Sequence, residues 1–577
     1  MGKEKKSSVA VIIVCLLAII LGFFLNGGKR GLNVDDYSHR AHAFDYATGG
    51  WRPTLVPSQA NFRPIEGILV PNLAHALPRY EFPVRLAILL VHVANVALLG
   101  LLAWRLVPNR LVLVAVLWLF LIPVLANEAV VRFCSSAVYP PSLLVFMVGL
   151  HASLNACLRD TSTLKRALFA VLGIGLWAIT PLIKEIVTFL VLVLPLIVGF
   201  LSGWKRKPLR RAFLICASTF ALFSAWYYFV LRHSYQVSRR GGVEFNLLFL
   251  FTQRVPAVLK RLVWLMGEWG FTGPLLEAMR LGIQEWMGTY WGWLLVLGFL
   301  VGLLAAVLLS QKEERTGGAP DAAACGSLLI TGALWAALVM CPILVVRRQI
   351  VEIRTLYPAW AGLSLAIAGL LGLITDALSR WFSHARRLVL LVLGMVLLAN
   401  AFTMAGLVRL YDLRWQWDQD QIRAFRQAIP ELPDAEPVWV MPVTLDEKCA
   451  SAYLGRSTML DRYLMGVFET PWSTSGALSM EYRQQNINAV ASHRWDRLHF
   501  TDLVRSPSGQ IESLVVQGSE VPVSSLIAFT FREGEVILLD PLVLVDSKGQ
   551  EIVLDLALAK RYSNPEADRE AMRLPLD

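Results

Sequence analysis

Charge is scarce in this chain. Only 17% of its 577 residues are Asp, Glu, Lys or Arg, whereas 56% are hydrophobic and the mean hydropathy is +0.54. Soluble globular proteins usually carry about a quarter charged residues. This shortage of charge excludes an ordinary soluble protein and predicts a polytopic membrane protein.

The sequence also lacks cysteine motifs and glycosylation signals. The seven cysteines form no Cys-x-x-Cys pair and no other spacing typical of a metal site, and most lie in or beside apolar segments. The chain contains no Asn-x-Ser/Thr sequon, which fits a bacterial source. The net charge of +11 does not indicate a nucleic-acid partner, because the basic residues cluster between apolar runs, where they act as topology signals.

Apolar segments long enough to cross hydrocarbon are abundant. The first follows Lys3, Lys5 and Lys6 and has no clear cleavage site, so we interpret it as an uncleaved helix. We expect about eleven transmembrane helices, near 9–25, 84–104, 111–126, 138–157, 167–182, 186–203, 212–231, 291–309, 327–346, 356–375 and 388–408.

The basic residues of the short connections predict the orientation. Eighteen of them fall on the side of the N-terminus and five on the other side. Because cytoplasmic loops are enriched in Lys and Arg, we expect a cytoplasmic N-terminus in a bacterial inner membrane. Segments 26–83, 232–290 and the tail then lie outside.

The outer segments differ in character. Segment 232–290 and the residues just after it are rich in tryptophan among apolar residues, which suits helices lying in the membrane interface. The tail carries short β-branched runs such as Val438–Met441 and Ile527–Phe531. We therefore predict a transmembrane domain over 1–410 and an extracytoplasmic α/β domain over 411–577.

Asp35 and Asp36 stand about ten residues beyond the first apolar run, so they are expected on the outer face. One of the two carboxylates is a candidate general base for an acceptor hydroxyl, and the other can orient the acceptor or bind a cation. A helix N-cap is the alternative explanation. Asp36 and His39 share a helical face and, with His42, are candidate ligands for a divalent cation, although packed or solvated histidines are commoner.

Two further connections carry charges that suit a lipid phosphate. Lys184 and Glu185 lie at the outer hairpin between the fifth and sixth predicted spans, where a lysine either binds a phosphate or snorkels at a turn. The connection before the tenth predicted span holds Arg347, Arg348 and Arg354, with Glu352 placed to orient Arg354 or contact a sugar. Interface anchoring is the alternative for these arginines.

The order of these motifs resembles the GT-C superfamily of integral-membrane glycosyltransferases, especially the protein O-mannosyltransferase-like and bacterial polyprenyl-phosphate-sugar-dependent branches. The matching features cover residues 1 to about 410. They are the Asp35-Asp36 pair, Phe62-Arg63-Pro64, the Lys184-Glu185 hairpin, and Glu352-x-Arg354-Thr-Leu-Tyr357-Pro358.

This resemblance implies an inverting hexosyl- or pentosyltransferase whose donor is a polyprenyl-phosphate sugar and whose acceptor is a glycan, lipid or protein. It makes Asp35 or Asp36 the catalytic base. Some members of the superfamily need a divalent cation such as Mg²⁺ or Mn²⁺ and others do not. The remaining assignments are donor phosphate binding by Arg63, Lys184, Arg347, Arg348 and Arg354, and acceptor binding or orientation by His39, Glu185, Glu352 and Tyr357.

Three other classes stay open. A transporter or flippase for a lipid-linked substrate would also use arginines and broken helices, but it predicts internal repeats and charges deep in the spans, which the sequence lacks. An O-antigen polymerase or ligase handles similar lipid-linked sugars without needing the Asp-Asp pair. A structural membrane scaffold is the third.

Overall fold

The structure, a computed structural model, forms two compact units that are described separately. The helical unit comprises Met1–Gly28, Leu55–Val70 and Tyr80–Arg409, and the strand unit comprises Lys29–Thr54, Pro71–Arg79 and Leu410–Asp577. The structure describes residues 34–48, 50–52, 63–76, 80–233, 246–265, 274–314, 321–345, 351–382, 384–434, 436–444, 466–491, 500–516, 518–532, 534–545, 550–562 and 573–575. The predicted span 9–25, Phe62, Arg347, Arg348 and the side chain of Asp35 lie outside this description.

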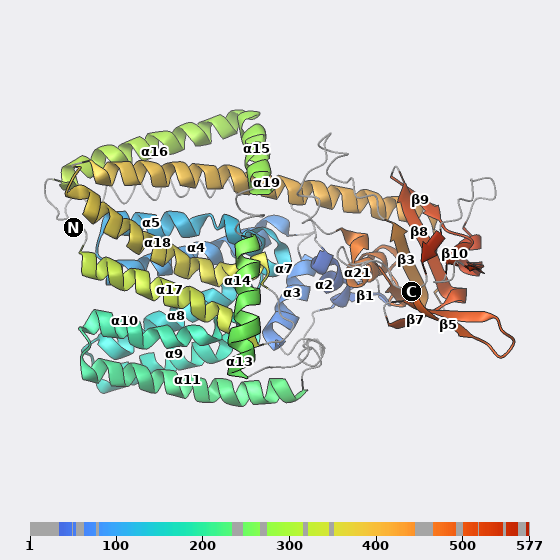
Figure 1. Cartoon of the computed structure of the whole chain (residues 1–577), viewed down its shortest axis with the longest axis horizontal. Helices are drawn as coiled ribbons and strands as arrows, with labels where there is room; N and C mark the ends of the chain where they lie inside the picture. The colour runs from blue at the N-terminus through green and yellow to red at the C-terminus, as the bar shows by residue number, and fades with distance from the viewer. Residues whose placement is uncertain are drawn as a thin grey trace. The chain divides into compact units, whose positions relative to one another are not determined.

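The helical unit is a bundle of long apolar helices drawn side by side in Figure 1. Its longer helices are α4 (Glu81–Leu106), α8 (Tyr139–Leu158), α9 (Thr163–Ile183), α11 (Arg206–His233), α15 (Pro274–Met287), α16 (Tyr290–Glu314), α17 (Ala322–Val345), α18 (Leu356–Ser379) and the part of α19 (Ala385–Ala428) up to Arg409. The shorter α10 (Val193–Ser202) also belongs to this unit.

Seven described helices are long and apolar enough to cross a membrane, or eight if the bent pair Pro274–Met287 and Gly292–Leu304 forms one span. The polytopic helical class is therefore confirmed, whereas the described residues do not reach the expected eleven spans. The first predicted span lies outside the description, and α5 (Arg110–Leu121) is short for a crossing. The side chain of Asn109 fixes the start of α5 by accepting hydrogen bonds from the amides of Leu111 and Val112.

Close packing of α17 against α18 depends on small residues. A Cβ atom on Gly332 would lie 2.4 Å from the carbonyl oxygen of Gly362, so these helix backbones touch. Small residues permit such contacts between transmembrane helices, where van der Waals packing contributes much of the association. Within the pair, α18 also packs against α5 and α8 (Figure 1).

Helix α19 is much longer than a bilayer requires. Its 44 residues correspond to about 66 Å at about 1.5 Å per residue, roughly twice the hydrocarbon thickness. The apolar part ends near Val408, and the boundary between the two units falls after Arg409. We therefore treat the residues from Arg409 onward as lying outside the membrane span.

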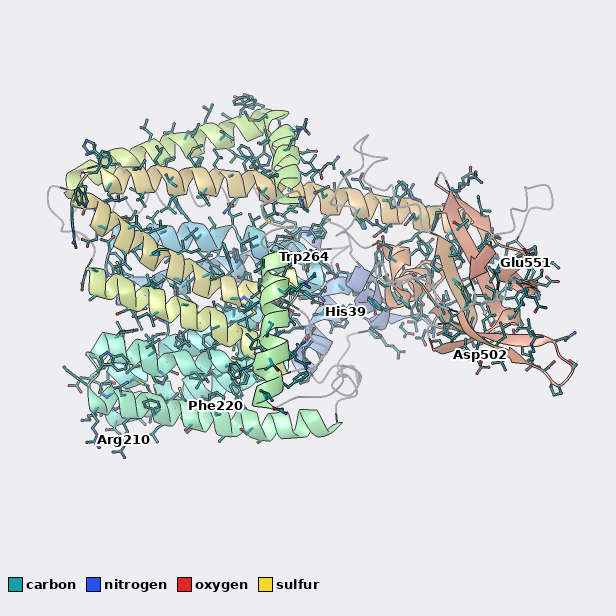
Figure 2. All side chains as sticks on the ribbon, viewed as in Figure 1. His39, Arg210, Phe220, Trp264, Asp502 and Glu551 are labelled. Atoms are coloured by element: carbon teal, nitrogen blue, oxygen red, sulfur yellow. The ribbon has the colours of Figure 1, made fainter. Side chains whose placement is uncertain are left out.

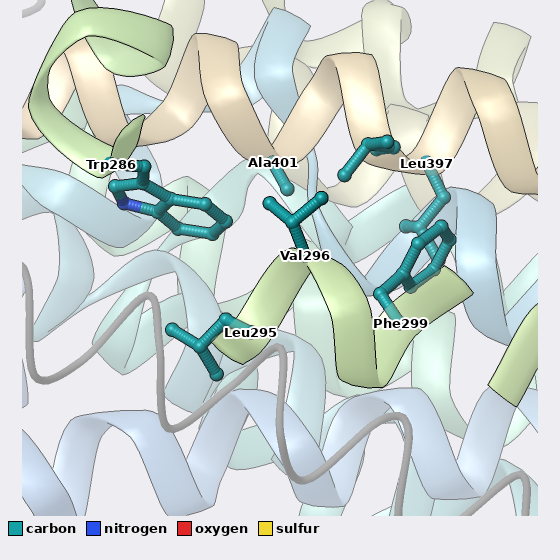
Figure 3. Close-up of a pocket in the computed structure, with 7 residues that line it drawn as sticks. Trp286, Leu295, Val296, Phe299, Leu397 and Ala401 are labelled. Atoms are coloured by element: carbon teal, nitrogen blue, oxygen red, sulfur yellow. The ribbon is translucent and has the colours of Figure 1, made fainter. Parts of the chain in front are cut away.

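A small apolar pocket lies where α15 and α16 meet α19 (Figure 3). Its lining is Trp286, Leu295, Val296, Phe299, Leu397, Leu398 and Ala401. This lining offers aliphatic and aromatic surface with little polar area for binding a charged group, so we place no chemistry there.

The strand unit is built on a mixed four-stranded sheet in the order β4-β3-β8-β9. Strands β4 (Ile487–Ala489), β3 (Val438–Thr444) and β8 (Leu526–Arg532) are parallel, and β9 (Glu535–Leu538) pairs antiparallel with β8. Strands β3 and β8 confirm the prediction that the β-branched runs of the tail form strands.

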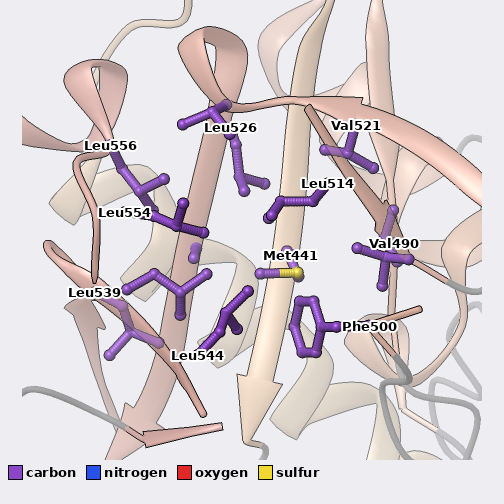
Figure 4. Packing of buried hydrophobic residues seen from close by; sticks show 14 of the residues in the cluster. Met441, Val490, Phe500, Leu514, Val521, Leu526, Leu539, Leu544, Leu554 and Leu556 are labelled. Atoms are coloured by element: carbon purple, nitrogen blue, oxygen red, sulfur yellow. The ribbon is translucent and has the colours of Figure 1, made fainter. Parts of the chain in front are cut away.

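Two three-stranded sheets complete the strand unit. One has the order β5-β6-β7 and the other the order β11-β10-β12. Met441, Phe500, Leu514, Leu526 and Leu544 belong to the hydrophobic core among these sheets (Figure 4). The strands are β5 (Phe500–Arg505), β6 (Ile511–Val516), β7 (Ser519–Pro522), β10 (Leu542–Val545), β11 (Glu551–Leu554) and β12 (Arg573–Pro575).

Candidate functional site

A cluster of ion pairs lies in the helical unit, built on Arg63 and Glu185. The Nη2 atom of Arg63 lies 2.5 Å from Oε1 of Glu185, and its Nε lies 2.6 Å from Oε2. The Nη1 atom of Arg63 also donates to Oε2 of Glu66 over 3.1 Å. Lys184 Nζ lies 3.4 Å from the other oxygen of Glu66, so four charged side chains form one network.

Local sequence explains why these side chains meet. Arg63 immediately precedes α3 (Pro64–Ala76), whose first residue is a proline and whose first turn holds Glu66, both favourable at a helix start. Lys184 is extended, with φ −157° and ψ 124°, and separates α9 from the 3-10 helix η2 (Glu185–Leu192). The break therefore places Lys184 and Glu185 next to each other between α9 and η2.

A second ion pair forms where α17 connects to α18. Glu352 caps the short 3-10 helix η5 (Ile353–Thr355) through a capping box with Thr355, and its Oε2 lies 2.6 Å from Nε of Arg354. Nearby, Arg132 lies 3.7 Å from Glu128 of α6 (Glu128–Val131).

Electrostatic interactions link the network around Arg63 and Glu185 to the Glu352–Arg354 pair. Burial opposes ionisation of Glu352, but attraction by Arg354, Arg132 and Lys184 outweighs it and holds the pKa of this carboxyl below its usual value. Burial and the repulsion of Arg63 lower the pKa of Lys184, and Glu66 and Glu185 act in the opposite direction. The Nζ atom of Lys184 also lies 5.2 Å from the ring centre of Tyr139.

We call these eight residues the ion-pair cluster. Their formal charges balance, since four cationic side chains face four carboxylates at neutral pH. The side chains are only partly shielded, and Glu185 (34% exposed) and Glu352 (33%) are the most accessible carboxylates. The members are Arg63, Arg132, Lys184, Arg354, Glu66, Glu128, Glu185 and Glu352.

Tyr357 occupies a different environment, although it follows Arg354 by three residues. Its side chain is fully buried, and its hydroxyl lies 2.7 Å from Nδ1 of His92 and 3.3 Å from Nδ2 of Asn95. The other ring nitrogen of His92 lies 2.9 Å from the carbonyl of Leu121, at the end of α5. These contacts bind helices together inside the unit.

The helix that carries Asp35 and Asp36 belongs to the strand unit. Helix α2 (Val34–His42) packs against α21 (Pro471–Tyr482), and the side chain of Asp36 is completely buried. A Cβ atom on Gly476 would lie 2.7 Å from the amide nitrogen of Ser38, so only glycine admits this approach of the two backbones.

The C-terminal part of α19, which belongs to the strand unit, takes part in a buried group of polar side chains. Arg414 Nε lies 3.2 Å from Oδ1 of Asp418, and its Nη2 lies 3.2 Å from Oε1 of Glu469. The amide of Val467 donates to the same Asp418 oxygen over 3.0 Å. Burial raises the pKa of Asp418 to about 7, although Arg414 acts to lower it.

The same group connects to α2 through Tyr37. The Nε2 atom of Gln419 donates to the Tyr37 hydroxyl over 3.0 Å. Burial, with the negative charge of Asp418, holds the pKa of Tyr37 well above its usual value. Sequence reasoning missed Arg414, Asp418 and Glu469, although the i,i+4 spacing of Arg414 and Asp418 just beyond an apolar run was a readable signal.

The described residues do not assemble a metal-ligand set. Across the described part of the chain, no three His, Cys, Asp or Glu side chains gather in a way that could hold a metal ion. His39 is half-buried and His42 exposed on α2, and the carboxylates of Glu66, Glu185 and Glu352 already face cations.

Among known proteins, the chain is similar to several solved structures. No protein-family model matches the sequence, and no curated protein matches it either. The chain is similar to ArnT from Cupriavidus metallidurans bound to undecaprenyl phosphate, at 17% identity over 84% of this chain and 90% of that chain, with a TM-score of 0.33.

Two archaeal structures are similar as well. The oligosaccharyltransferase AglB from Archaeoglobus fulgidus, in complex with an inhibitory peptide and a dolichol-phosphate, is 14% identical over 85% of this chain and 65% of that chain, with a TM-score of 0.41. An Archaeoglobus fulgidus oligosaccharyltransferase tethered with an acceptor peptide is 13% identical over 90% of this chain and 76% of that chain, with a TM-score of 0.38. At these values the similarities assign neither a family nor an activity to this chain.

Proposed function

We propose that this protein is an inverting GT-C-type membrane glycosyltransferase. It moves a hexose or pentose from a polyprenyl-phosphate donor to an acceptor hydroxyl on a glycan, lipid or protein at the outer face of the cytoplasmic membrane. The ion-pair cluster is the observation that carries this proposal. It gathers four cations at breaks in an apolar helical bundle, where unpaired charge is costly and a lipid-borne phosphate is a suitable partner.

The cluster is suited to exchange one anion for another. Arg63 forms a bidentate contact with a carboxylate, and Arg354 forms one short contact with another. Guanidinium groups bind phosphate oxygens in the same bidentate way as carboxylates. Glu185 and Glu352 are the carboxylates most open to water, so they can turn outward when a phosphate replaces them. Arg347 and Arg348 join the proposed phosphate-binding set on the strength of the sequence alone.

The chemistry follows from the charge that develops during transfer. A base takes the proton of the acceptor hydroxyl, the acceptor oxygen bonds to the anomeric carbon, and the bond from that carbon to the phosphate oxygen breaks with inversion. The departing phosphate gains negative charge, which Arg63, Lys184 and Arg354 stabilise. We assign the base to the Asp35-Asp36 pair, as the resemblance implies.

The proposed topology follows the distribution of basic residues. The N-terminus lies in the cytoplasm, residues 1–410 form the transmembrane domain, and residues 411–577 form the extracytoplasmic domain. The donor phosphate then reaches the ion-pair cluster at the outer interface. His39 keeps its candidate role in binding or orienting the acceptor. Tyr357 is fully buried, so it keeps only an orienting role, through the residues packed around it.

Transfer of a radiolabelled sugar tests this function. Purified protein in lipid nanodiscs is given polyprenyl-phosphate sugars and membrane extract as acceptor. We expect Asp36→Asn or Asp35→Asn to lower kcat by about 100-fold or more, the usual effect of losing a general base. Arg63→Gln should raise the KM for the donor. The exposed residues Asp502 and Arg210 provide the matched controls Asp502→Asn and Arg210→Gln, which should leave transfer unchanged. Absence of transfer from every donor by the wild type would contradict the proposal.

A further inference from the structure

One helix of the helical unit runs across the others. Residues 247–265 form a continuous helix made of α13 (Leu247–Phe249), a π turn η3 (Leu250–Arg254) and α14 (Val255–Trp264). In Figure 1, α14 runs across the direction of α17 and α11 at one end of the bundle, and Figure 2 shows Trp264 there and Arg210 at the opposite end of the bundle.

The π turn has a local cause. Pro256 lacks an amide hydrogen, and its ring would clash with the carbonyl of Thr252 in a regular α-helix. Widening the turn before Pro256 relieves this clash while the helix continues, and the Thr252 hydroxyl donates to the carbonyl of Leu248 over 2.7 Å. The helix therefore stays intact across a proline that would otherwise interrupt it.

The side chains of this helix fall into three groups. Arg254, Val258 and Leu265 are buried against the unit, at a spacing that puts them on one face. Gln253 and Lys260 form an exposed polar face. A third face is apolar yet 55 to 72% exposed, and it comprises Leu248, Phe251, Leu259 and Val263.

Two arginines attach the helix to the end of α17 and to the connection that follows it. Arg254 Nη2 donates to the carbonyl of Ile343 over 2.9 Å and its Nε donates to that of Leu344 over 3.3 Å. These carbonyls belong to the last turn of α17, where helix carbonyls lack partners and cations are favourable. Arg261 Nε donates to the carbonyl of Val351 over 3.3 Å, one residue before Glu352.

We propose that the helix 247–265 lies in the headgroup–acyl boundary of the bilayer and that Arg261, through Val351, holds the Glu352–Arg354 pair at the depth of a lipid phosphate. The helix has the sequence of an interfacial helix, because segment 246–265 contains three basic residues and no acidic one and has separate apolar and polar exposed faces. Arg261 is thus a positioning residue, and its role rests on the proposed function.

Photocrosslinking tests where the apolar face lies. The photoreactive amino acid p-benzoylphenylalanine replaces Leu259 or, as the matched control one residue along, Lys260, in full-length protein in nanodiscs of phosphatidylethanolamine and phosphatidylglycerol. We expect intact-mass analysis to show lipid adducts severalfold more often at Leu259. Equal yields at both positions, or a crosslinked dimer of the chain at Leu259, would overturn the interfacial placement. This measurement does not depend on enzyme activity.

Binding of undecaprenyl phosphate, measured by native mass spectrometry, tests the positioning role. We expect Arg261→Gln to raise the Kd about fivefold, the scale of one lost hydrogen bond, while Arg261→Lys recovers part of the loss and Lys260→Gln changes nothing. If the wild type binds undecaprenyl phosphate and Arg261→Gln binds it equally well, the positioning role alone is overturned. Failure of the wild type to bind would instead contradict the proposed function.

Discussion

Arg63 and Glu185 form a bidentate ion pair across 122 residues of sequence, with N–O distances of 2.5 and 2.6 Å. This pairing means that the arginine we assign to the donor phosphate already holds a carboxylate. A phosphate must therefore compete with Glu185 for the same guanidinium group. If Arg63 binds the donor phosphate as we propose, we expect the affinity for the lipid to depend on Glu185 as well as on Arg63.

The Glu185→Gln variant tests this competition. Removing the negative charge frees Arg63 for phosphate, so we expect the Kd for undecaprenyl phosphate to fall about fivefold. Native mass spectrometry of the protein in nanodiscs measures it. Glu81→Gln is the matched control, because Glu81 pairs with Arg85 at 2.9 Å outside the cluster and should leave the Kd unchanged. Weaker binding by Glu185→Gln would show that Glu185 supports the phosphate site instead of competing with it.

Gly476 allows α2 to approach α21, so its replacement tests how that helix is held. In Gly476→Ala, the new Cβ would meet the backbone of Tyr37 and Ser38 within 2.8 Å, and the two helices must move apart. We expect a loss of about 1–3 kcal/mol in stability, typical of overpacking, and a lower Tm in thermal unfolding. The exposed Glu481 on the same helix provides the control Glu481→Ala. An unchanged Tm for Gly476→Ala would show that the two backbones are not in contact.

Sequence patterns predicted the parts of this structure that are locally determined. The predicted span 167–182 lies within α9, and the run Ile527–Phe531 lies within β8, because apolar length and β-branched content act over a few turns or residues. The polytopic helical region and the strand-rich tail were both predictable on this basis.

Long-range pairing was not predictable in the same way. The sequence marked Arg63, Lys184 and Glu185 separately, but nothing local joins residues 122 positions apart. The sequence also did not indicate that α2, which carries Asp36, belongs to the strand unit, because this depends on the packing of α2 against α21. Asp418 was missed because its burial comes from tertiary contacts that periodicity does not record.

The raised pKa of Asp418 predicts a pH dependence of stability. Its carboxyl titrates near pH 7 in the folded protein and near 3.8 when unfolded, so the folded state binds the proton more tightly. This group's contribution to stability is full below about pH 4 and is lost as the pH rises towards 7. We expect Asp418→Asn to reduce the change in Tm between pH 5 and pH 8, whereas the exposed Asp502→Asn should not. If Asp418→Asn keeps the full change in Tm between pH 5 and pH 8, titratable groups other than Asp418 cause that change.

We expect removal of the Tyr357 hydroxyl to lower the stability of the protein. Tyr357→Phe keeps the ring but leaves Nδ1 of His92 without its partner at 2.7 Å and removes the contact with Asn95, in a fully buried setting. An unsatisfied buried polar group costs about 1–3 kcal/mol, so we expect a lower Tm in thermal unfolding. Tyr290, which is 75% exposed, provides the control Tyr290→Phe, for which we expect no shift. Equal Tm values for Tyr357→Phe and wild type would show that the hydrogen bond between Tyr357 and His92 contributes no measurable stability.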